Sequence, residues 1–242
     1  MMGMTITVEV IDEGVVEEDL EKVFLYFDYV DQKFSTYKET SEISLINKGE
    51  IKESEYSQDM KIVFKLSEET KQLTNGYFDI RKNDGKIDPS GLVKGWAIYN
   101  SSKILKANGF NNFFVDAGGD IEVSGKNLEG DNWKVGIQNP FKPKEIIKVV
   151  SLSSCGMATS GTYIRGQHIY NPFKPSEALE EIVSLSVIGP NVYEADRFAT
   201  SGFAMGREGI NFIESLDGFE GYMVDLKGLA TETSNFGKYV CK

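Results

Sequence analysis

The sequence has 242 residues but only one histidine, two cysteines and six prolines. Cys155 and Cys241 lie far apart and form no C-x-x-C pair, which argues against a structural disulfide or zinc site. Cys155 is expected to be a small buried residue. No apolar run is long enough to cross a bilayer, and the start of the chain lacks the basic and apolar regions of a signal peptide. We therefore expect a cytoplasmic protein, or an exported or membrane-anchored one whose leader has been removed.

Positive charge is also scarce. The chain carries 26 Lys and Arg against 37 Asp and Glu, for a formal net charge of -11 and an isoelectric point near 4.8. An acidic surface repels a phosphate backbone, so nucleic acid is excluded as the expected partner. An anionic ligand would need a metal ion or local cations to offset this repulsion.

The remaining composition is that of a globular protein rich in turns, with 40% hydrophobic residues and 24 glycines. No linker divides the chain, so one compact domain over 1–242 is expected. Apolar spacing predicts helices over 16–34, 57–74, 91–108 and 195–206, and strands over 4–11, 112–115, 121–124, 133–138, 146–152, 182–188 and 221–225. Helices dominate the first half and strands the centre, which favours the α+β class.

His168 is the single imidazole, and imidazole alone has an unperturbed pKa close to neutral pH. Small hydroxylated residues precede it at 159–162, and a turn-forming Asn171-Pro172 follows. This composition suits the close approach of a polar ligand. The alternative is a histidine that is hydrogen bonded within a strand.

The segment Asp88–Gly95 places an aspartate, a glycine and Lys94 at a loop-to-helix junction. Such a junction favours an anionic group, and Lys94 would supply positive charge to a phosphate oxygen. The alternative is a well-capped helix with an exposed lysine.

Two glycines stand between acidic residues in Val115-Asp-Ala-Gly-Gly-Asp-Ile121. They allow the backbone to pass close to a ligand, while Asp120 can accept hydrogen bonds from a base or sugar. The alternative is an ordinary hairpin turn.

Asp196 and Thr200 stand four residues apart in a predicted helix, so their oxygens face the same way. A carboxylate and a hydroxyl on one face can share a hard cation such as Mg²⁺. The alternative is that Asp196 caps the helix. Together with a lysine, a glycine-rich wall and one imidazole, this pair suits phosphoryl-type transfer.

Taken in order, these motifs resemble the ApbE family, the FAD:protein FMN transferases. The resemblance runs nearly from end to end and rests on residues 2–10, 34–44, 76–79, 88–95, 116–120, 159–163, 168–172 and 195–200. It implies an ApbE-like domain related to the T-fold, with mixed helices and a central, largely antiparallel sheet.

The resemblance also implies an activity. A magnesium-dependent enzyme would take FAD, move its FMN half to a threonine or serine hydroxyl of an acceptor protein, and release AMP. By position, Asp196, Thr200 and the carbonyl of Gly91 resemble the Mg²⁺ ligands, and His168 resembles the catalytic histidine. The positions that resemble FAD contacts are Met2, Tyr37, Phe78, Asp79, Asp88, Lys94 and Asp120.

Two departures from the family pattern concern acceptor choice. Asn171 stands where the family usually has aspartate, and the stretch from Asp79 to Asp88 is short. Two other functions fit the same motifs. One is hydrolysis of FAD to FMN and AMP, and the other is flavin binding without catalysis, in which His168 is structural.

Overall fold

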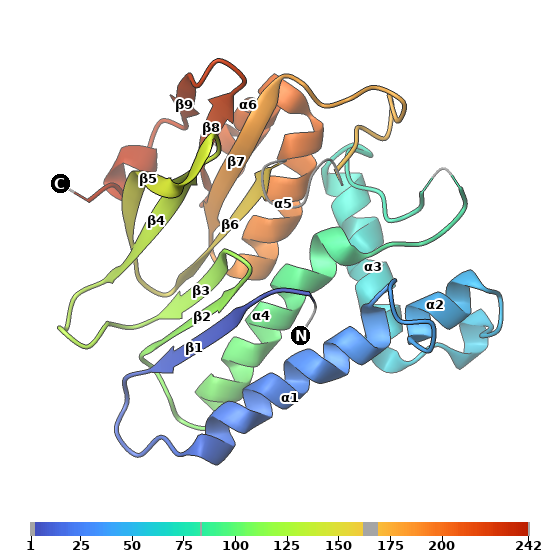
Figure 1. Ribbon diagram of the computed structural model, residues 1–242, viewed down its shortest axis with the longest axis horizontal. Helices are drawn as coiled ribbons and strands as arrows, with labels where there is room; N and C mark the ends of the chain where they lie inside the picture. The colour runs from blue at the N-terminus through green and yellow to red at the C-terminus, as the bar shows by residue number, and fades with distance from the viewer. Residues whose placement is uncertain (1–2, 83, 162–168, 242) are drawn as a thin grey trace.

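A seven-stranded sheet forms the centre of the protein in the computed structural model, which describes residues 3–82, 84–161 and 169–241 (Figure 1). Its strands, in spatial order, are β1 (Ile6–Val10), β2 (Phe113–Ala117), β3 (Asp120–Ser124), β6 (Cys155–Gly161), β7 (Ile182–Gly189), β8 (Glu220–Asp225) and β9 (Ala230–Glu232). Every neighbouring pair is antiparallel. This arrangement confirms the α+β class and the antiparallel sheet.

Helices pack on one face of the sheet, and further helices pack on these helices (Figure 1). They are α1 (Glu17–Phe34), α2 (Glu42–Asn47), α3 (Gln58–Leu73), α4 (Ser90–Ala107), α5 (Val192–Ala204) and α6 (Gly209–Glu214), with short 3-10 turns at Glu53–Glu55, Gly206–Glu208 and Phe236–Lys238. Helix α4 packs on β2 and β3, whereas α5 packs on β6 and β7. The two helices also pack against each other, and this contact forms the base of the functional site.

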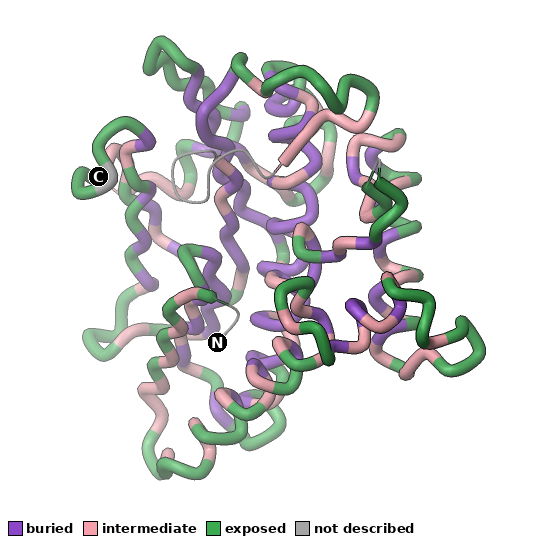
Figure 2. Tube along the Cα trace, turned by 45° about the vertical axis from the view of Figure 1, so that its right-hand side comes forward, coloured by how far each residue is buried: buried purple, intermediate pink, exposed green. Residues whose placement is uncertain are grey.

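Helical spacing explains why α1 joins this layer. Val23, Phe27, Val30 and Phe34 recur every three or four residues, and all are buried against α4 and its neighbours. Figure 2 shows the buried backbone running through the strands and the inner helices. Among the helices of the described ranges, none is both long and apolar enough for a membrane span.

A two-stranded hairpin, β4 (Trp133–Asn139) and β5 (Lys142–Leu152), contributes to a separate core cluster. Trp133, Val135 and Ile137 alternate with exposed residues and pack with side chains of β3, β8 and the C-terminal 3-10 turn. The helix-side core and this hairpin-side core give the sheet two covered faces.

Most predicted elements lie within a few residues of the observed ones, but two of the α-helices and two of the strands described here were not predicted: α2, α6, β6 and β9. Apart from the buried Met157, strand β6 is made of small and hydroxylated residues that lack the apolar alternation of a half-buried strand. Its Gly156 is required by packing, since a Cβ there would lie 1.9 Å from the backbone nitrogen of Val192. The expectation that Cys155 is buried was wrong, because its side chain is partly exposed at the start of β6.

Candidate functional site

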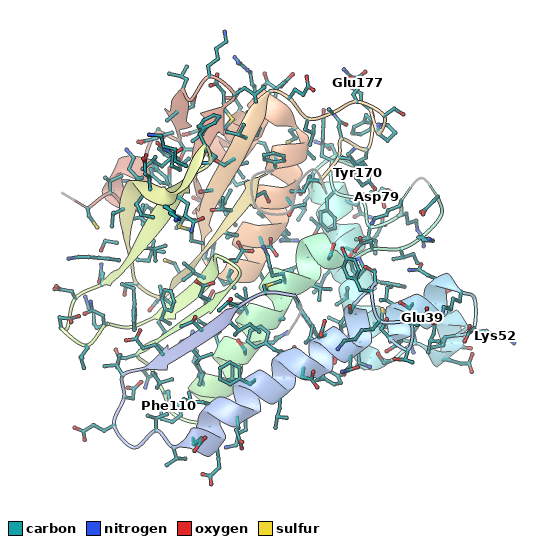
Figure 3. The ribbon with its side chains drawn as sticks, in the orientation of Figure 1. Glu39, Lys52, Asp79, Phe110, Tyr170 and Glu177 are labelled. Carbon is teal, nitrogen blue, oxygen red and sulfur yellow. The ribbon has the colours of Figure 1, made fainter. Side chains whose placement is uncertain are left out.

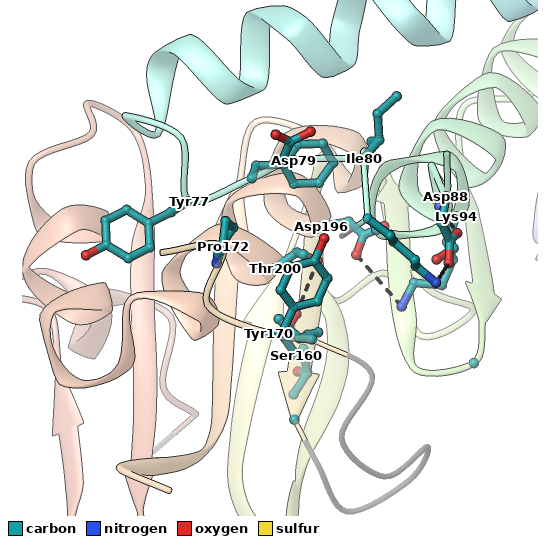
Figure 4. A pocket seen from close by; sticks show the side chains of 18 residues that line it. Tyr77, Asp79, Ile80, Asp88, Lys94, Ser160, Tyr170, Pro172, Asp196 and Thr200 are labelled. Carbon is teal, nitrogen blue, oxygen red and sulfur yellow. Dashed lines mark hydrogen bonds and ion pairs between the residues drawn. The ribbon is translucent and has the colours of Figure 1, made fainter. Parts of the chain in front are cut away.

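One pocket collects residues from distant parts of the chain (Figure 4). Its walls come from the segment after α3, the first turns of α4, the β2–β3 turn, the end of β6, the segment 169–172 and α5. The predicted site residues that line it are Phe78, Asp79, Asp88, Gly91, Lys94, Asp196 and Thr200. The motifs identified separately in the sequence therefore meet in one place.

A lysine and two carboxylates form the buried base of this pocket. The Lys94 ammonium contacts Oδ2 of Asp120 and lies 3.8 Å from Oδ1 of Asp196. Asp120 also accepts a hydrogen bond from the backbone of Thr159 (3.1 Å), and Asp196 accepts one from the backbone of Gly95 (2.8 Å). In the Lys94–Asp120–Asp196 cluster, two acidic side chains thus share a single cationic side chain.

Burial has a direct effect on Asp196. Its side chain is 4% exposed, and burial raises its pKa above the usual range, opposed by the charge of Lys94 and helped by the charge of Asp120. A buried carboxylate beside a second carboxylate is stabilised by any added cation. The cluster is therefore suited to a divalent metal ion.

Thr200 and Gly91 add oxygen ligands of the type that Mg²⁺ prefers. Thr200 lies one helical turn beyond Asp196, and a Cβ on Gly91 would lie 3.1 Å from Cγ2 of Thr200. The backbone of α4 thus passes close to the hydroxyl. In the part of the chain that the structure describes, no three Asp, Glu, His or Cys side chains gather into a metal cluster. A cation here would use a mixed set of carboxylate, hydroxyl and main-chain carbonyl, and the residues present fit that set.

The alternative in which Asp196 caps its helix is wrong. Helix α5 begins at Val192, and its N-cap is Asn191, whose side chain accepts a hydrogen bond from the backbone of Glu194 (3.0 Å). Asp196 therefore lies in the second turn, where its side chain reaches the pocket.

The alternative in which Lys94 is an exposed helix lysine is also wrong, since its side chain is only 14% exposed. Asp88 does stabilise the first turn of α4, because its Oδ1 accepts a hydrogen bond from the backbone of Ser90 (3.1 Å). Its Oδ2 lies 2.5 Å from Nζ of Lys82, a residue that sequence reasoning did not single out.

Gly118 and Gly119 form the β2–β3 hairpin turn, and Gly118 also lies at the site. Both have positive φ angles, 64° at Gly118 and 92° at Gly119, which favour glycine. Gly119 donates its backbone N–H to Asp116 (2.8 Å), and Gly118 lines the pocket. The hairpin interpretation is confirmed, and the ligand-facing interpretation stays a prediction.

Phe78 and Asp79 form the wall that follows α3. Phe78 is 4% exposed, and its backbone donates a hydrogen bond to the hydroxyl of Thr74 (3.1 Å). Asp79 accepts a hydrogen bond from Lys71 (2.6 Å), which fixes the carboxylate at the rim. Figure 3 shows Asp79 and Tyr170 on the same side of the molecule, and both line the pocket.

Of the predicted site residues that the structure describes, two do not line the pocket: Asp120, which contacts Lys94, and Tyr37. Tyr37 lies between α1 and α2 with its side chain 97% exposed, and it is not a lining residue. Met2 and His168 lie outside the described residues. Gly161 and Ile169, the described residues on either side of the segment that includes His168, both line the pocket.

Sequence reasoning missed several lining residues. Tyr170 and Pro172 come two and four residues after His168 in the sequence and could have been found from that motif. Lys82 belongs to no motif, so the sequence alone could not have identified it as a lining residue.

A family model described as the ApbE family matches residues 2–84 and 80–223 of the chain. FAD:protein FMN transferase from Escherichia coli (strain K12) is 28% identical over 156 residues, covering 61% of this chain and 44% of that protein. The protein of the same name from Treponema pallidum is 29% identical over 141 residues, covering 51% of this chain and 39% of that protein. The matches span less than half the length of these curated relatives.

Solved structures show the same fold. The flavin transferase ApbE from Vibrio cholerae superposes with a TM-score of 0.85 at 21% identity, covering 98% of this chain and 96% of that one. The ApbE protein from Thermotoga maritima gives a TM-score of 0.88 at 20% identity, and the match covers 100% of this chain and 97% of that one. The arrangement of sheet and helices is therefore shared over nearly the whole chain.

Proposed function

The chain belongs to the ApbE family, and from that premise we propose that it is a magnesium-dependent FAD:protein FMN transferase. It would move the FMN part of FAD to a threonine or serine hydroxyl of an acceptor protein and release AMP. The names of the curated relatives support this activity. The observation that carries it is the meeting of Asp88, Gly91, Lys94, Asp196 and Thr200 in one pocket.

The residues that would hold Mg²⁺ are Asp196, Thr200 and the carbonyl of Gly91. The bound ion would supply positive charge that offsets the charge of the diphosphate as a P–O bond breaks. Asp120 holds the ammonium of Lys94 beside Asp196. This contact fixes the positions of both charged side chains before a ligand enters, and such preorganisation favours charge stabilisation.

The transfer needs a base, since an unmodified hydroxyl is a poor nucleophile at neutral pH. In the proposed reaction the acceptor oxygen forms a bond to the phosphorus of the FMN half, and the P–O bond to AMP breaks. The hydroxyl proton passes to His168, and AMP leaves with the bridging oxygen. Support for this role is the position of Gly161 and Ile169, which flank the segment of His168 and line the pocket.

Incubation with FAD, Mg²⁺ and a flavin-acceptor domain tests the proposal. We expect the intact mass of the acceptor to increase by one covalently bound FMN, and AMP to be released in equal amount. His168→Ala should lower the rate by about 100-fold or more, because general base catalysis contributes that much. An acceptor in which the target threonine is replaced by valine serves as the control.

Two results would contradict the transferase assignment. Release of FMN and AMP without acceptor labelling would indicate hydrolysis. Recovery of bound FAD unchanged, in the presence of Mg²⁺ and acceptor, would indicate a flavin-binding protein.

A further inference from the structure

The short stretches 80–82 and 84–88 pair with each other at the rim of the pocket. Lys82 donates its backbone N–H to the carbonyl of Lys86 (2.8 Å). The second stretch is tied to α2 by Asn47, whose side chain accepts from the backbone N–H of Ile87 (2.8 Å) and donates to its carbonyl (2.9 Å). The backbone of Lys82 therefore has a defined position at the rim.

Asp88 then directs the side chain of Lys82 into the pocket. Nζ of Lys82 lies 2.5 Å from Oδ2 of Asp88, and both residues line the pocket. The Asp88 side chain is 14% exposed, whereas that of Lys82 is 44% exposed. Partial burial disfavours the ammonium, but the hydrogen bond and charge of Asp88 outweigh it and raise the pKa of Lys82. Lys82 is thus cationic at neutral pH and open to a ligand.

The charge of the pocket explains why this cation matters. Its described lining residues include three carboxylates, of Asp79, Asp88 and Asp196, but only two lysines, Lys82 and Lys94. Lys94 lies deep, between Asp120 and Asp196. A diphosphate that enters this pocket would meet net negative charge, which must be offset on its open side as well as at its base.

We propose that Lys82 is a binding residue for the diphosphate of FAD, with Asp88 as the residue that positions it. This inference rests on the proposed function and adds a contact to the same site. Lysine acts as a compact point charge with three N–H donors, so one donor can bind Asp88 while another binds a phosphate oxygen. Asp88 would then act on the ligand through Lys82 as well as through the start of α4.

The test is the dissociation constant for FAD and for riboflavin, which lacks phosphate, measured by titration calorimetry with Mg²⁺ present. Lys82→Gln should weaken FAD binding by about 10-fold or more, the usual effect of losing a hydrogen bond to a charged group. Riboflavin binding should stay unchanged. Lys82→Arg keeps the charge and should restore most of the affinity for FAD.

Lys86→Gln is the matched control. Lys86 lies on the paired stretch 84–88, but its side chain is 68% exposed, pairs with Asp84 at 3.7 Å and is not a pocket-lining residue. This variant should bind FAD as the wild type does. Thermal unfolding of each variant confirms that the fold is retained.

Two outcomes overturn the assignment of Lys82: equal FAD affinity in wild type and Lys82→Gln, or equal weakening of FAD and riboflavin. If the wild type transfers FMN while Lys82→Gln binds FAD normally, only this inference fails. If the wild type binds no FAD, the proposed function fails and the inference with it.

Discussion

Glu122 on β3 is a buried acidic side chain that positions α5 from outside the pocket. It is 3% exposed, and its Oε2 accepts a hydrogen bond from the backbone of Val192 (2.6 Å) at the start of the helix. A carboxylate at a helix N-terminus is favourable. Burial nevertheless prevails and raises its pKa from 4.5 to about 7, against the hydrogen bond from Val192 and the charges of Lys106 and Lys103.

Stability should therefore fall with rising pH through this one residue. Between about pH 4.5 and pH 7 the folded state keeps the proton on Glu122 and the unfolded state loses it, so the free energy of unfolding decreases and then levels off. The total loss is about 3 kcal/mol at 1.36 kcal/mol per pKa unit. Glu122→Gln removes this contribution.

Urea unfolding of wild type and Glu122→Gln at pH 5 and pH 8 measures the effect. We expect the unfolding free energy of the wild type to drop by about 2.5 kcal/mol more than that of the variant over this range, because part of the total is already lost at pH 5. The comparison at pH 5, where the folded protein carries neutral Glu122, is the internal control. Parallel pH profiles for the two proteins would show that the pKa of Glu122 is not raised.

At the scale of elements, the crossing of α4 and α5 positions the site, and Gly95 makes it possible. A Cβ at Gly95 would lie 2.6 Å from Cβ of Asp196 and 2.8 Å from the carbonyl oxygen of Val192. Both atoms belong to α5, and a carbonyl cannot move away as a flexible side chain does. The absence of a side chain at Gly95 thus brings the two helices together and holds Asp196 against α4.

Gly95→Ala should therefore destabilise the protein, by about 1–3 kcal/mol as overpacking does. The sign of the change in unfolding free energy is informative, because alanine normally stabilises a helix interior by about 1 kcal/mol relative to glycine. Urea unfolding monitored by circular dichroism measures the change. Gly237→Ala is the control, since a Cβ there meets no atom within 4 Å. A more stable Gly95→Ala protein would contradict the close crossing.

The elements also show how far sequence reasoning reaches. The periodic helices α1 and α3 were predicted closely, because buried residues such as Val23 and Phe27 repeat at helical spacing. Strand β6 was not predicted, since its burial depends on contact with α5, as at Gly156, and not on apolar composition. The start of α5 was misplaced, although Asn191 followed by Glu194 is a capping signal that the sequence contains.

At the site too, local sequence patterns could be predicted, whereas contacts that depend on the tertiary fold could not. Asp88, Lys94 and Asp196 were found because they lie in local motifs, and the fold brings them together. The contact between Lys94 and Asp120 joins α4 to β3, and no local pattern encodes it. Lys82 was missed for the same reason, because its role depends on the pairing of the stretches 80–82 and 84–88, which places it beside Asp88.

At the scale of the whole molecule, a net charge of -11 makes the protein sensitive to cations. Surface carboxylates bind divalent ions weakly and without a defined coordination geometry. Asp196 and Thr200, in contrast, offer oxygens on one helix face inside a pocket. A specific site should therefore be separable from general charge screening. Binding to the folded state alone raises stability by about 2.7 kcal/mol at a ligand concentration 100 times the dissociation constant.

We expect Mg²⁺ at that concentration to raise the thermal midpoint by roughly 5–10 °C, given about 2–4 °C per kcal/mol for a chain of this size. EDTA should reverse the shift. Asp196→Asn should abolish most of it, because the variant loses the buried carboxylate that the ion would bind. Asp217→Asn removes one exposed charge that does not line the pocket and should keep the full shift. Differential scanning calorimetry at fixed ionic strength separates specific Mg²⁺ binding in the pocket from general screening of the acidic surface. Equal Mg²⁺ shifts in wild type and Asp196→Asn would show that the ion acts on the acidic surface and not in the pocket.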